Sequence, residues 1–173
     1  MESSLSLKPS RRESESQRSA PTPLIRLAHA EDAPAVAAAV RELLLELSGT
    51  APALDAMERT TRAVLANPGL GVVLVACERE RIVGVLSASW QTAIHVPGRY
   101  GLIQDLWVAP DRRSASLGRL LLLALFELAV EHEIVRIEVG LPSERFAGLD
   151  ATRSFYETNG FTLLGPRMRQ MLL

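Results

Sequence analysis

The sequence has little of what metal sites and disulfide scaffolds need. Among its 173 residues there is a single cysteine, Cys77, and there are three widely separated histidines. One cysteine cannot form an intrachain disulfide, so a disulfide-stapled secreted fold is excluded. Neither an HExxH nor a CxxC spacing occurs, so we expect no metal site.

An excess of charge of either sign is also missing. Lys and Arg total 19, Asp and Glu total 20, and the net charge is −1 with a pI of about 6.3. A basic excess supplies most of the affinity of nucleic-acid-binding proteins, so the balance argues against a nucleic-acid partner. Hydrophobic residues make up 47% of the chain, which is enough to bury the core of one domain.

No apolar run is long enough to cross a membrane. The longest, Leu120–Val130, is about half of the roughly 20 residues that a bilayer requires, and it is typical of a buried helix. Residues Met1–Pro23 contain seven serines and three prolines and lack the apolar core of a signal peptide. We therefore expect a disordered tail over 1–23, one domain over 24–173, and a cytoplasmic location without a membrane partner.

Hydrophobic periodicity predicts strands and helices in a mixed order. β-Branched runs predict strands, and longer amphipathic or Leu-rich runs predict helices. The expected strands are Leu24–Ala28, Val72–Glu78, Ile82–Ser89, Leu102–Val108, Ile134–Val139 and a terminal pair around Phe161–Leu164 and Met168–Leu172. The expected helices are Asp32–Leu47, Leu54–Ala66, Leu117–His132 and Ala151–Asn159. This order predicts a mixed α/β fold in which helices cover both faces of a central mixed sheet.

The stretch Leu106–Leu120 is the most informative part of the chain. A strand ends at Val108, small residues and arginines follow, and a long helix begins after them. Backbone N–H groups converge at such a helix start, and the helix dipole adds positive potential. The stretch is therefore a candidate anion site of the size of a phosphate or pyrophosphate, with a plain strand–loop–helix connection as the alternative.

The same stretch resembles the GNAT superfamily of N-acetyltransferases. The family pattern V-x-P-x-x-[RQ]-x-x-G-x-[GA] is matched by Val108, Pro110, Arg113 and Gly118, with Ser116 at the first glycine position. A second family signature, F-Y-x-x-x-G-F, is intact from Phe155 to Phe161. The resemblance covers about residues 24–173 and implies a GNAT-like sheet with a β-α-β acetyl-CoA-binding core.

The resemblance also implies which residues hold acetyl-CoA as co-substrate. The backbone of Leu106, Trp107 and Val108 is expected to pair with the pantetheine arm. The pyrophosphate is expected at Arg113 and at the N–H groups of Ser114, Ala115, Ser116, Leu117, Gly118 and Arg119. Tyr156 matches the residue that protonates the departing thiolate, although a core aromatic is the alternative.

Two positions depart from the family pattern. Ser116 stands where the family has glycine, and a Cβ at a turn that needs positive φ costs about 1 kcal/mol or more. Leu149 stands where family members often have an asparagine that contacts the cofactor arm. Both departures keep an alternative function open, a CoA-binding sensor or interaction module without turnover.

Attack on a thioester requires a neutral amine, so a base is expected. Asp105 is the best candidate because it lies in the apolar strand LIQDLWV, where partial desolvation raises the pKa of a carboxyl group. An orienting or ion-paired carboxylate is the alternative role, and Glu144 is the second candidate base. We therefore expect an acetyl-CoA-dependent N-acetyltransferase that acts on a primary amine by direct attack in a ternary complex. Small-molecule and protein amines remain equal candidates, and a homodimer is left open.

Overall fold

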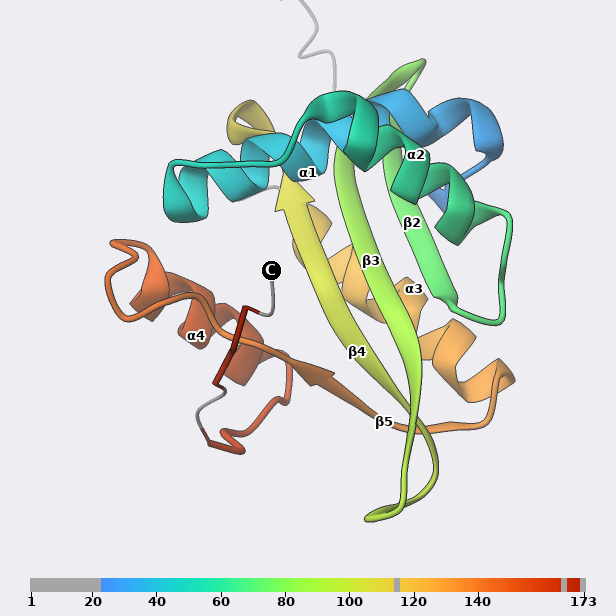
Figure 1. Cartoon of the computed structure of the whole chain (residues 1–173), viewed down its shortest axis with the longest axis vertical. Helices are drawn as coiled ribbons and strands as arrows, with labels where there is room; N and C mark the ends of the chain where they lie inside the picture. The colour runs from blue at the N-terminus through green and yellow to red at the C-terminus, as the bar shows by residue number, and fades with distance from the viewer. Residues whose placement is uncertain (1–22, 114–115, 166–167, 172–173) are drawn as a thin grey trace, which may run out of the picture.

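The computed structural model describes residues 23–113, 116–165 and 168–171. Five strands and four α-helices follow one another along these residues (Figure 1). The strands are β1 Leu24–Leu27, β2 Gly71–Glu78, β3 Arg81–Ala93, β4 Val96–Val108 and β5 Ile134–Val139. The helices are α1 Ala33–Ser48, α2 Leu54–Leu65, α3 Leu117–Glu131 and α4 Leu149–Thr158, with 3₁₀ turns η1 Ala30–Asp32 and η2 Pro110–Arg112.

The sheet is mixed, as the element order predicts. Its strands lie in the order β1-β2-β3-β4-β5, antiparallel from β1 to β4 and parallel between β4 and β5. In Figure 1, α1 and α2 cross in front of the upper part of the sheet and α3 lies behind it. The expected α/β class, with helices on both faces, is confirmed.

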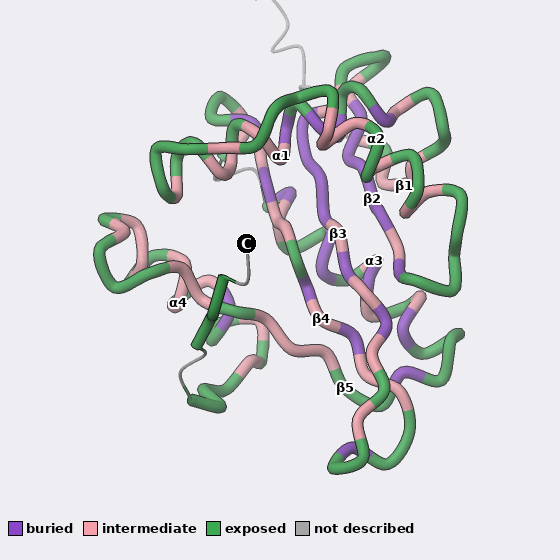
Figure 2. The backbone as a smooth tube through the Cα atoms, viewed as in Figure 1, coloured by how far each residue is buried: buried purple, intermediate pink, exposed green. Residues whose placement is uncertain are grey.

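The core lies on both faces of β2, β3 and β4. On one face, the apolar side of α3 buries Leu117, Leu121, Leu122 and Leu125 almost completely. A β-carbon built on Gly84 of β3 would lie 3.1 Å from Leu121 Cδ1, so the strand approaches α3 closely. On the other face, Trp107 is buried beside alanines of α1. Figure 2 shows the buried residues concentrated along β2 and the upper part of β3.

The expected terminal strand pair is wrong within the described residues. Residues 161–165 and 168–171 contain no strand, and Leu163 and Leu164 are largely exposed. Gly160 precedes the first of these segments and Gly165 is its last residue, with φ values of 89° and 129°. An apolar β-branched pattern forms a strand only when a neighbouring edge pairs with it, and no such pairing is made here.

Two other expected strands are longer than the sequence predicts. β3 extends to Ala93 and β4 begins at Val96, so the two strands form a long hairpin. The polar stretches Trp90–Ala93 and Val96–Gly101 lack the apolar run that a sequence pattern needs, but they pair with each other across the hairpin. The expected tail over residues 1–23, Pro23 excepted, lies outside the described residues, as do Ser114 and Ala115.

The parallel strands β4 and β5 separate where the anion-site stretch begins. Their pairing runs from Arg99 and Ile134 to Ile103 and Val139, where β5 ends. β4 continues to Val108 with β3 on its other side, and Figure 1 shows β5 turning away from it. The last residues of β4 therefore have an edge that β5 does not cover.

Candidate functional site

The uncovered edge of β4 carries the backbone groups of alternate residues. Ala109 donates its N–H to the Val83 carbonyl at 2.9 Å, so the backbone N–H and C=O of Ala109 point to β3. Along an antiparallel pair, the backbone N–H and C=O groups of successive residues point alternately toward the partner strand and away from it. The backbone groups of Trp107 therefore also point to β3, and those of Leu106 and Val108 point to the open edge. Of the three residues expected to pair with the cofactor arm, two present their backbone there, while Trp107 lies opposite Val85 in the β3–β4 register.

Asp105 lies in β4 directly before this edge. The Ser87 hydroxyl of β3 donates a hydrogen bond of 2.5 Å to its carboxylate. Burial raises the pKa of the Asp105 carboxyl group, and the hydrogen bond from Ser87 lowers it to a smaller extent. The direction agrees with the expected partial desolvation, and it favours a carboxylate that accepts protons more readily than an exposed one.

The raised pKa of Asp105 makes a prediction for stability. A carboxyl group whose pKa is raised on folding stabilises the folded state at pH values below its unfolded pKa of about 4 and loses that contribution as pH rises through the folded pKa. We therefore expect Asp105→Asn to raise Tm at pH 8, and to raise it less or not at all at pH 4. Thermal unfolding of both proteins across this range measures the difference, and an equal shift at every pH would contradict the assigned cause.

Tyr156 of α4 is buried and lies within electrostatic reach of Asp105. Its ring packs edge-on against Phe155 and Phe161, each with a centroid distance of 5.2 Å. Burial, and to a smaller extent the charge of Asp105, raise the pKa of Tyr156 to about 12. Asp105 and Tyr156 therefore lie within electrostatic reach of each other, and the phenol is protonated at neutral pH.

Glu144 differs from this pair in its exposure to solvent. It is exposed in the turn after β5. It borders a cavity of about 1160 Å³ that is also lined by Tyr156, by Leu149 at the start of α4 and by the segment 159–165. Glu144 thus shares a cavity with Tyr156, but it lacks the burial that sets Asp105 apart.

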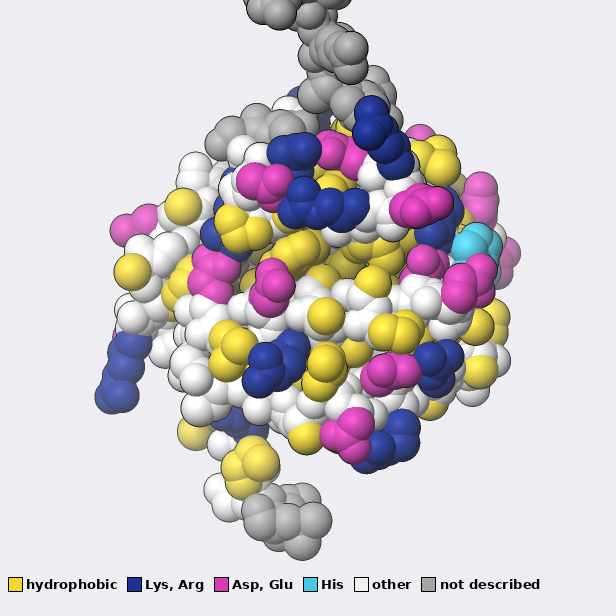
Figure 3. Space-filling view, turned by 90° about the horizontal axis from the view of Figure 1, so that it is seen from above, with side chains coloured by type: hydrophobic (Ala, Val, Ile, Leu, Met, Phe, Trp, Pro, Cys, Tyr) yellow, Lys and Arg dark blue, Asp and Glu magenta, His cyan; other side chains and the backbone are white. Residues whose placement is uncertain are grey.

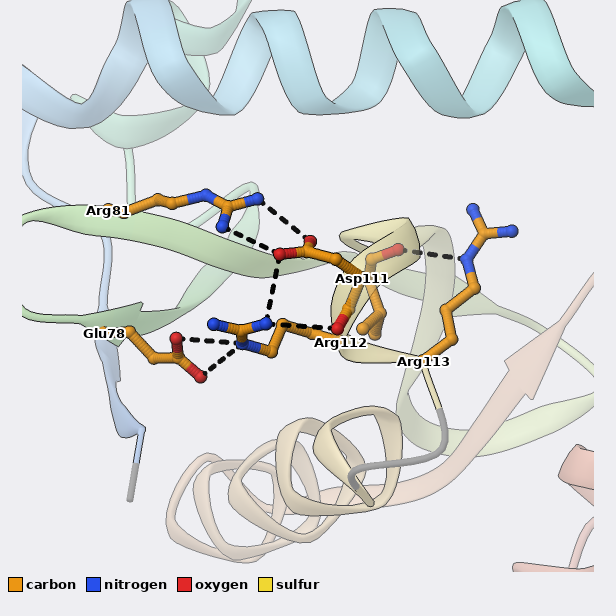
Figure 4. Close-up of polar contacts among 6 residues, drawn as sticks. Glu78, Arg81, Asp111, Arg112 and Arg113 are labelled. Carbon is orange, nitrogen blue, oxygen red and sulfur yellow. Dashed lines mark hydrogen bonds and ion pairs between the residues drawn. The ribbon is translucent and has the colours of Figure 1, made fainter. Parts of the chain in front are cut away.

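Ion pairs fix the turn between β4 and α3 (Figure 4). Arg112 Nε lies 2.8 Å from a carboxylate oxygen of Glu78 at the end of β2. Arg81 of β3 binds Asp111 through both terminal nitrogens at 3.0 Å, and Arg112 Nη1 also lies 3.0 Å from Asp111. Exposed ion pairs contribute little stability singly, but this network ties η2 to the β2–β3 hairpin. The Arg112 guanidinium therefore binds carboxylates of the protein rather than contributing to the expected anion site.

Arg113 connects the open edge of β4 with α1. Its Nε donates to the Val108 carbonyl at 3.2 Å, as Figure 4 shows. Its two terminal nitrogens bind the Glu46 carboxylate of α1 at 2.9 and 2.6 Å. A phosphate at the start of α3 would have to compete with Glu46 for this guanidinium.

The start of α3 has the backbone that the sequence predicts to be strained. Ser116, the residue preceding the helix, has a φ of 60°, in the left-handed region that favours glycine. The residues of the following first turn, Leu117, Gly118 and Arg119, carry N–H groups that lack partners within the helix. A β-carbon built on Gly118 would lie 3.1 Å from Phe155 Cζ, so this glycine permits close packing of α3 on α4.

The left-handed serine gives a stability prediction. Ser116→Gly removes a Cβ from a conformation that costs L-residues roughly 1 kcal/mol, so we expect stabilisation by up to about that amount. Chemical denaturation measures the free energy of unfolding, and calorimetry measures the affinity for CoA. A loss of CoA affinity in the stabilised variant would show that the hydroxyl binds phosphate.

Three residues of this site were missed by sequence reasoning. Ser87 binds the candidate base, Glu46 binds Arg113, and Phe155 packs on Gly118. Phe155 belongs to the second family signature and could have been assigned a packing role from it. Ser87 and Glu46 reach the site through sheet register and helix packing, for which the local sequence contains no signal.

Charge and hydropathy of the described residues add two observations. Figure 3 shows basic and acidic side chains interspersed over the face seen from above. In the parts of the chain that the structure covers, no helix is long and apolar enough to cross a membrane, and no three His, Cys, Asp or Glu side chains gather to hold a metal ion.

Solved structures with the same fold include several acetyltransferases. An acetyltransferase from Trypanosoma brucei is 26% identical, with a TM-score of 0.64, and the match covers 87% of this chain and 99% of that one. Ribosomal-protein-alanine N-acetyltransferase from Brucella melitensis biovar Abortus 2308 is 17% identical, with a TM-score of 0.68, and 87% and 99% of the two chains are covered. Glucosamine-6-phosphate N-acetyltransferase from Arabidopsis thaliana is 19% identical, with a TM-score of 0.68 and coverage of 88% and 99%. The last two show the fold alone.

The sequence itself carries the family relationship. A comparison with curated proteins gives no match. The sequence profile of the acetyltransferase (GNAT) family matches residues 37–161, a range that includes the uncovered edge of β4, the start of α3 and the whole of α4. The chain therefore belongs to the GNAT acetyltransferase family.

Proposed function

We propose that the protein transfers an acetyl group from acetyl-CoA to a primary amine by direct attack in a ternary complex. The observation that carries the proposal is the partly buried Asp105 directly before the uncovered edge of β4, with the buried Tyr156 within its electrostatic reach. The carboxylate has a raised pKa and the phenol stays protonated, so one group can accept a proton and the other can donate a hydrogen bond. Amine acetylation needs both functions.

The residues present fit acetyl-CoA as the acyl donor. The N–H and C=O of Leu106 point to the open edge, where an extended arm can pair as an added strand. The first turn of α3 offers N–H groups and positive potential for a pyrophosphate, and Arg119 is exposed there. Bound acetyl-CoA would supply the activated thioester. Preorganised N–H donors such as that of Leu106 would polarise its carbonyl group.

Asp105 serves as the base in this proposal. An alkyl ammonium has a pKa near 10.4, so it must lose a proton before its nitrogen can attack. The partly buried Asp105 carboxylate, whose pKa is raised, accepts that proton better than an exposed carboxylate would. The hydrogen bond from Ser87 holds the carboxylate in place and leaves its second oxygen for the amine.

Tyr156 serves as the hydrogen-bond donor to the departing sulfur. With a pKa of about 12, its hydroxyl holds its proton more tightly than a thiol with a pKa of about 8.5. Complete transfer of that proton would be uphill by about 5 kcal/mol, taking 1.36 kcal/mol per pKa unit. Tyr156 therefore stabilises the thiolate by donation, and the proton lost from the amine ultimately neutralises it.

Release of free CoA thiol in the presence of primary amines tests this function. Wild type should release thiol only when both acetyl-CoA and an accepted amine are present. Tyr156→Phe keeps the buried ring and removes the hydroxyl, so we expect kcat to fall roughly 10-fold to 100-fold with CoA affinity nearly unchanged. CoA binding without thiol release from any amine would instead identify a sensor or interaction module.

A further inference from the structure

A row of polar side chains lies on the face of the sheet that α1 and α2 leave uncovered. It consists of Ser87, Ser89 and Gln91 of β3 with Gln104 and Asp105 of β4, and we call it the polar platform. In Figure 1, α1 and α2 cross the upper part of the sheet, and no helix lies in front of the lower parts of β3 and β4. Polar side chains at alternate strand positions face this open side because strand residues two apart share a face.

The platform and α3 lie on opposite faces of β3. Gly84 approaches Leu121 of α3, and Trp90 packs on His132 at the C-terminal end of α3 with a ring centroid distance of 5.9 Å. The even-numbered residues of β3 therefore face α3, and Ser87, Ser89 and Gln91 face away from it. Asp105 pairs with Ser87, so the candidate base opens onto the same face.

Ser89 accepts two hydrogen bonds within the platform, and neither of them uses the proton of its own hydroxyl group. Gln91 Nε2 and Gln104 Nε2 each donate to Ser89 Oγ at 2.8 Å. A hydroxyl oxygen accepts two hydrogen bonds and donates one, so both accepting positions of Ser89 are filled. The O–H of Ser89 is then available to donate to an acceptor atom that approaches from the open face.

The distance between Ser89 and the candidate base sets a second constraint. Ser87 lies opposite Asp105, and Ser89 lies two residues further along β3. Two residue steps along a strand span about 7 Å. An acceptor molecule that places its amine at Asp105 and an oxygen at Ser89 must therefore hold the two atoms roughly 6–7 Å apart.

We infer that the polar platform selects primary amines that carry a hydroxyl or carbonyl oxygen about 6–7 Å from the nitrogen, with Ser89 as the donor to that oxygen. At about 1.2 Å per bond in an extended chain, the spacing corresponds to roughly five or six bonds. A hydroxylated small amine meets this requirement. A lysine side chain meets it only in a bent conformation, because seven bonds separate its Nζ from its own backbone carbonyl oxygen. The inference rests on the proposed function, because the platform acts on the acceptor of that reaction.

A length series of amines tests this selectivity. The ω-amino alcohols with two to six carbons are compared with n-alkylamines of equal chain length, and the readout is the ratio of their kcat/KM values. The ratio should peak at about four or five carbons and reach roughly threefold to tenfold, which is the contribution of one hydrogen bond. Nα-acetyl-lysine amide and glucosamine, as two further substrates, then show whether a peptide amine or a hydroxylated small amine supplies the oxygen.

Three variants locate the effect at Ser89. Ser89→Ala removes the donor and should bring the ratio to about one. Gln104→Glu keeps Ser89 but replaces an amide donor by a carboxylate that only accepts, so the Ser89 proton turns inward and the ratio should again fall to about one. Thr60→Ala removes an exposed hydroxyl of α2, which is hydrogen-bonded to the Ala56 carbonyl, and should leave the ratio unchanged.

The outcomes separate this inference from the proposed function. Equal kcat/KM values for amino alcohols and alkylamines, or a preference that survives in Ser89→Ala, would overturn the inference and leave the acetyltransferase function standing. Absence of thiol release with every amine would overturn the proposed function and the inference with it. A misfolded Ser89→Ala protein would be recognised by its circular dichroism, and Gln104→Glu then decides alone.

Discussion

Replacing Asp105 by asparagine is expected to lower kcat/KM for an accepted amine by roughly 10²- to 10⁴-fold, the usual size of a general-base contribution. Asparagine keeps the shape of the side chain and can still accept the hydrogen bond from Ser87, but it cannot take up the ammonium proton. The remaining rate should rise with pH up to the pKa of the amine, because only the neutral amine reacts. Steady-state kinetics between pH 6 and pH 10 measure both effects.

Ser87→Ala is the matched control for this experiment. The hydrogen bond from Ser87 lowers the pKa of Asp105, so its removal should move the acidic limb of the wild-type pH profile to higher pH while the carboxylate remains. A purely structural role of Asp105 would not move that limb. If Asp105→Asn raises KM for the amine and leaves kcat unchanged, then Asp105 binds the ammonium and Glu144 or water takes up the proton.

Gly118→Glu is expected to weaken CoA binding by about 100-fold. A carboxylate at the start of α3 would lie near the expected pyrophosphate, and two like charges about 6 Å apart repel by roughly 3 kcal/mol at an effective dielectric constant near 20. Binding of pantetheine, which lacks the pyrophosphate, should change far less. Calorimetry with the two ligands therefore distinguishes charge repulsion from general damage.

Gly118→Ala separates packing from charge at the same position. The added Cβ would lie 3.1 Å from Phe155 Cζ, so the ring must move by a few tenths of an ångström. We expect a small loss of stability and less than about a 10-fold loss of CoA affinity, the equivalent of 1.4 kcal/mol. Equal losses in the alanine and glutamate variants would mean that Gly118 serves α3–α4 packing and that the phosphates bind elsewhere.

The expected elements agree with the structure where hydrophobic periodicity is strong. β5 has the bounds that its β-branched run predicts, and α3 begins at Leu117 and ends at Glu131, within one residue of the expectation. Agreement fails where pairing alone decides the structure, as in the polar hairpin between β3 and β4 and in the segment after α4. In those places the neighbouring strand, rather than the local side chains, determines whether a strand forms.

The residues of the candidate site divide in the same way, into those that the local sequence predicts and those that depend on contacts with distant parts of the chain. Asp105 and Tyr156 could be assigned from an apolar strand and a family signature, and the contribution of the Asp105 charge to the raised pKa of Tyr156 agrees with a shared site. The partners of the arginines could not be assigned, because Glu46 and Glu78 reach them from elements 67 and 34 residues away in the chain. An arginine-rich turn therefore reads as an anion site from sequence, whereas two of its guanidinium groups bind carboxylates.

The irregular pairing within β4 has a consequence for changes in chain length. Ala88 pairs with Ile103 and Ser87 with Asp105, so Gln104 is an extra residue in the strand. This bulge lets Ile103 enter the core and Asp105 open onto the other face, although residues two apart in a regular strand share a face. Deletion of Gln104 would leave Ile103 and Asp105 on their present faces as adjacent residues of a regular strand. Deletion of Leu106 would instead move the residues on one side of the deletion to the opposite face of the sheet, so that core and surface positions are exchanged. Along this part of β4, tolerance to a one-residue deletion is therefore confined to the bulge.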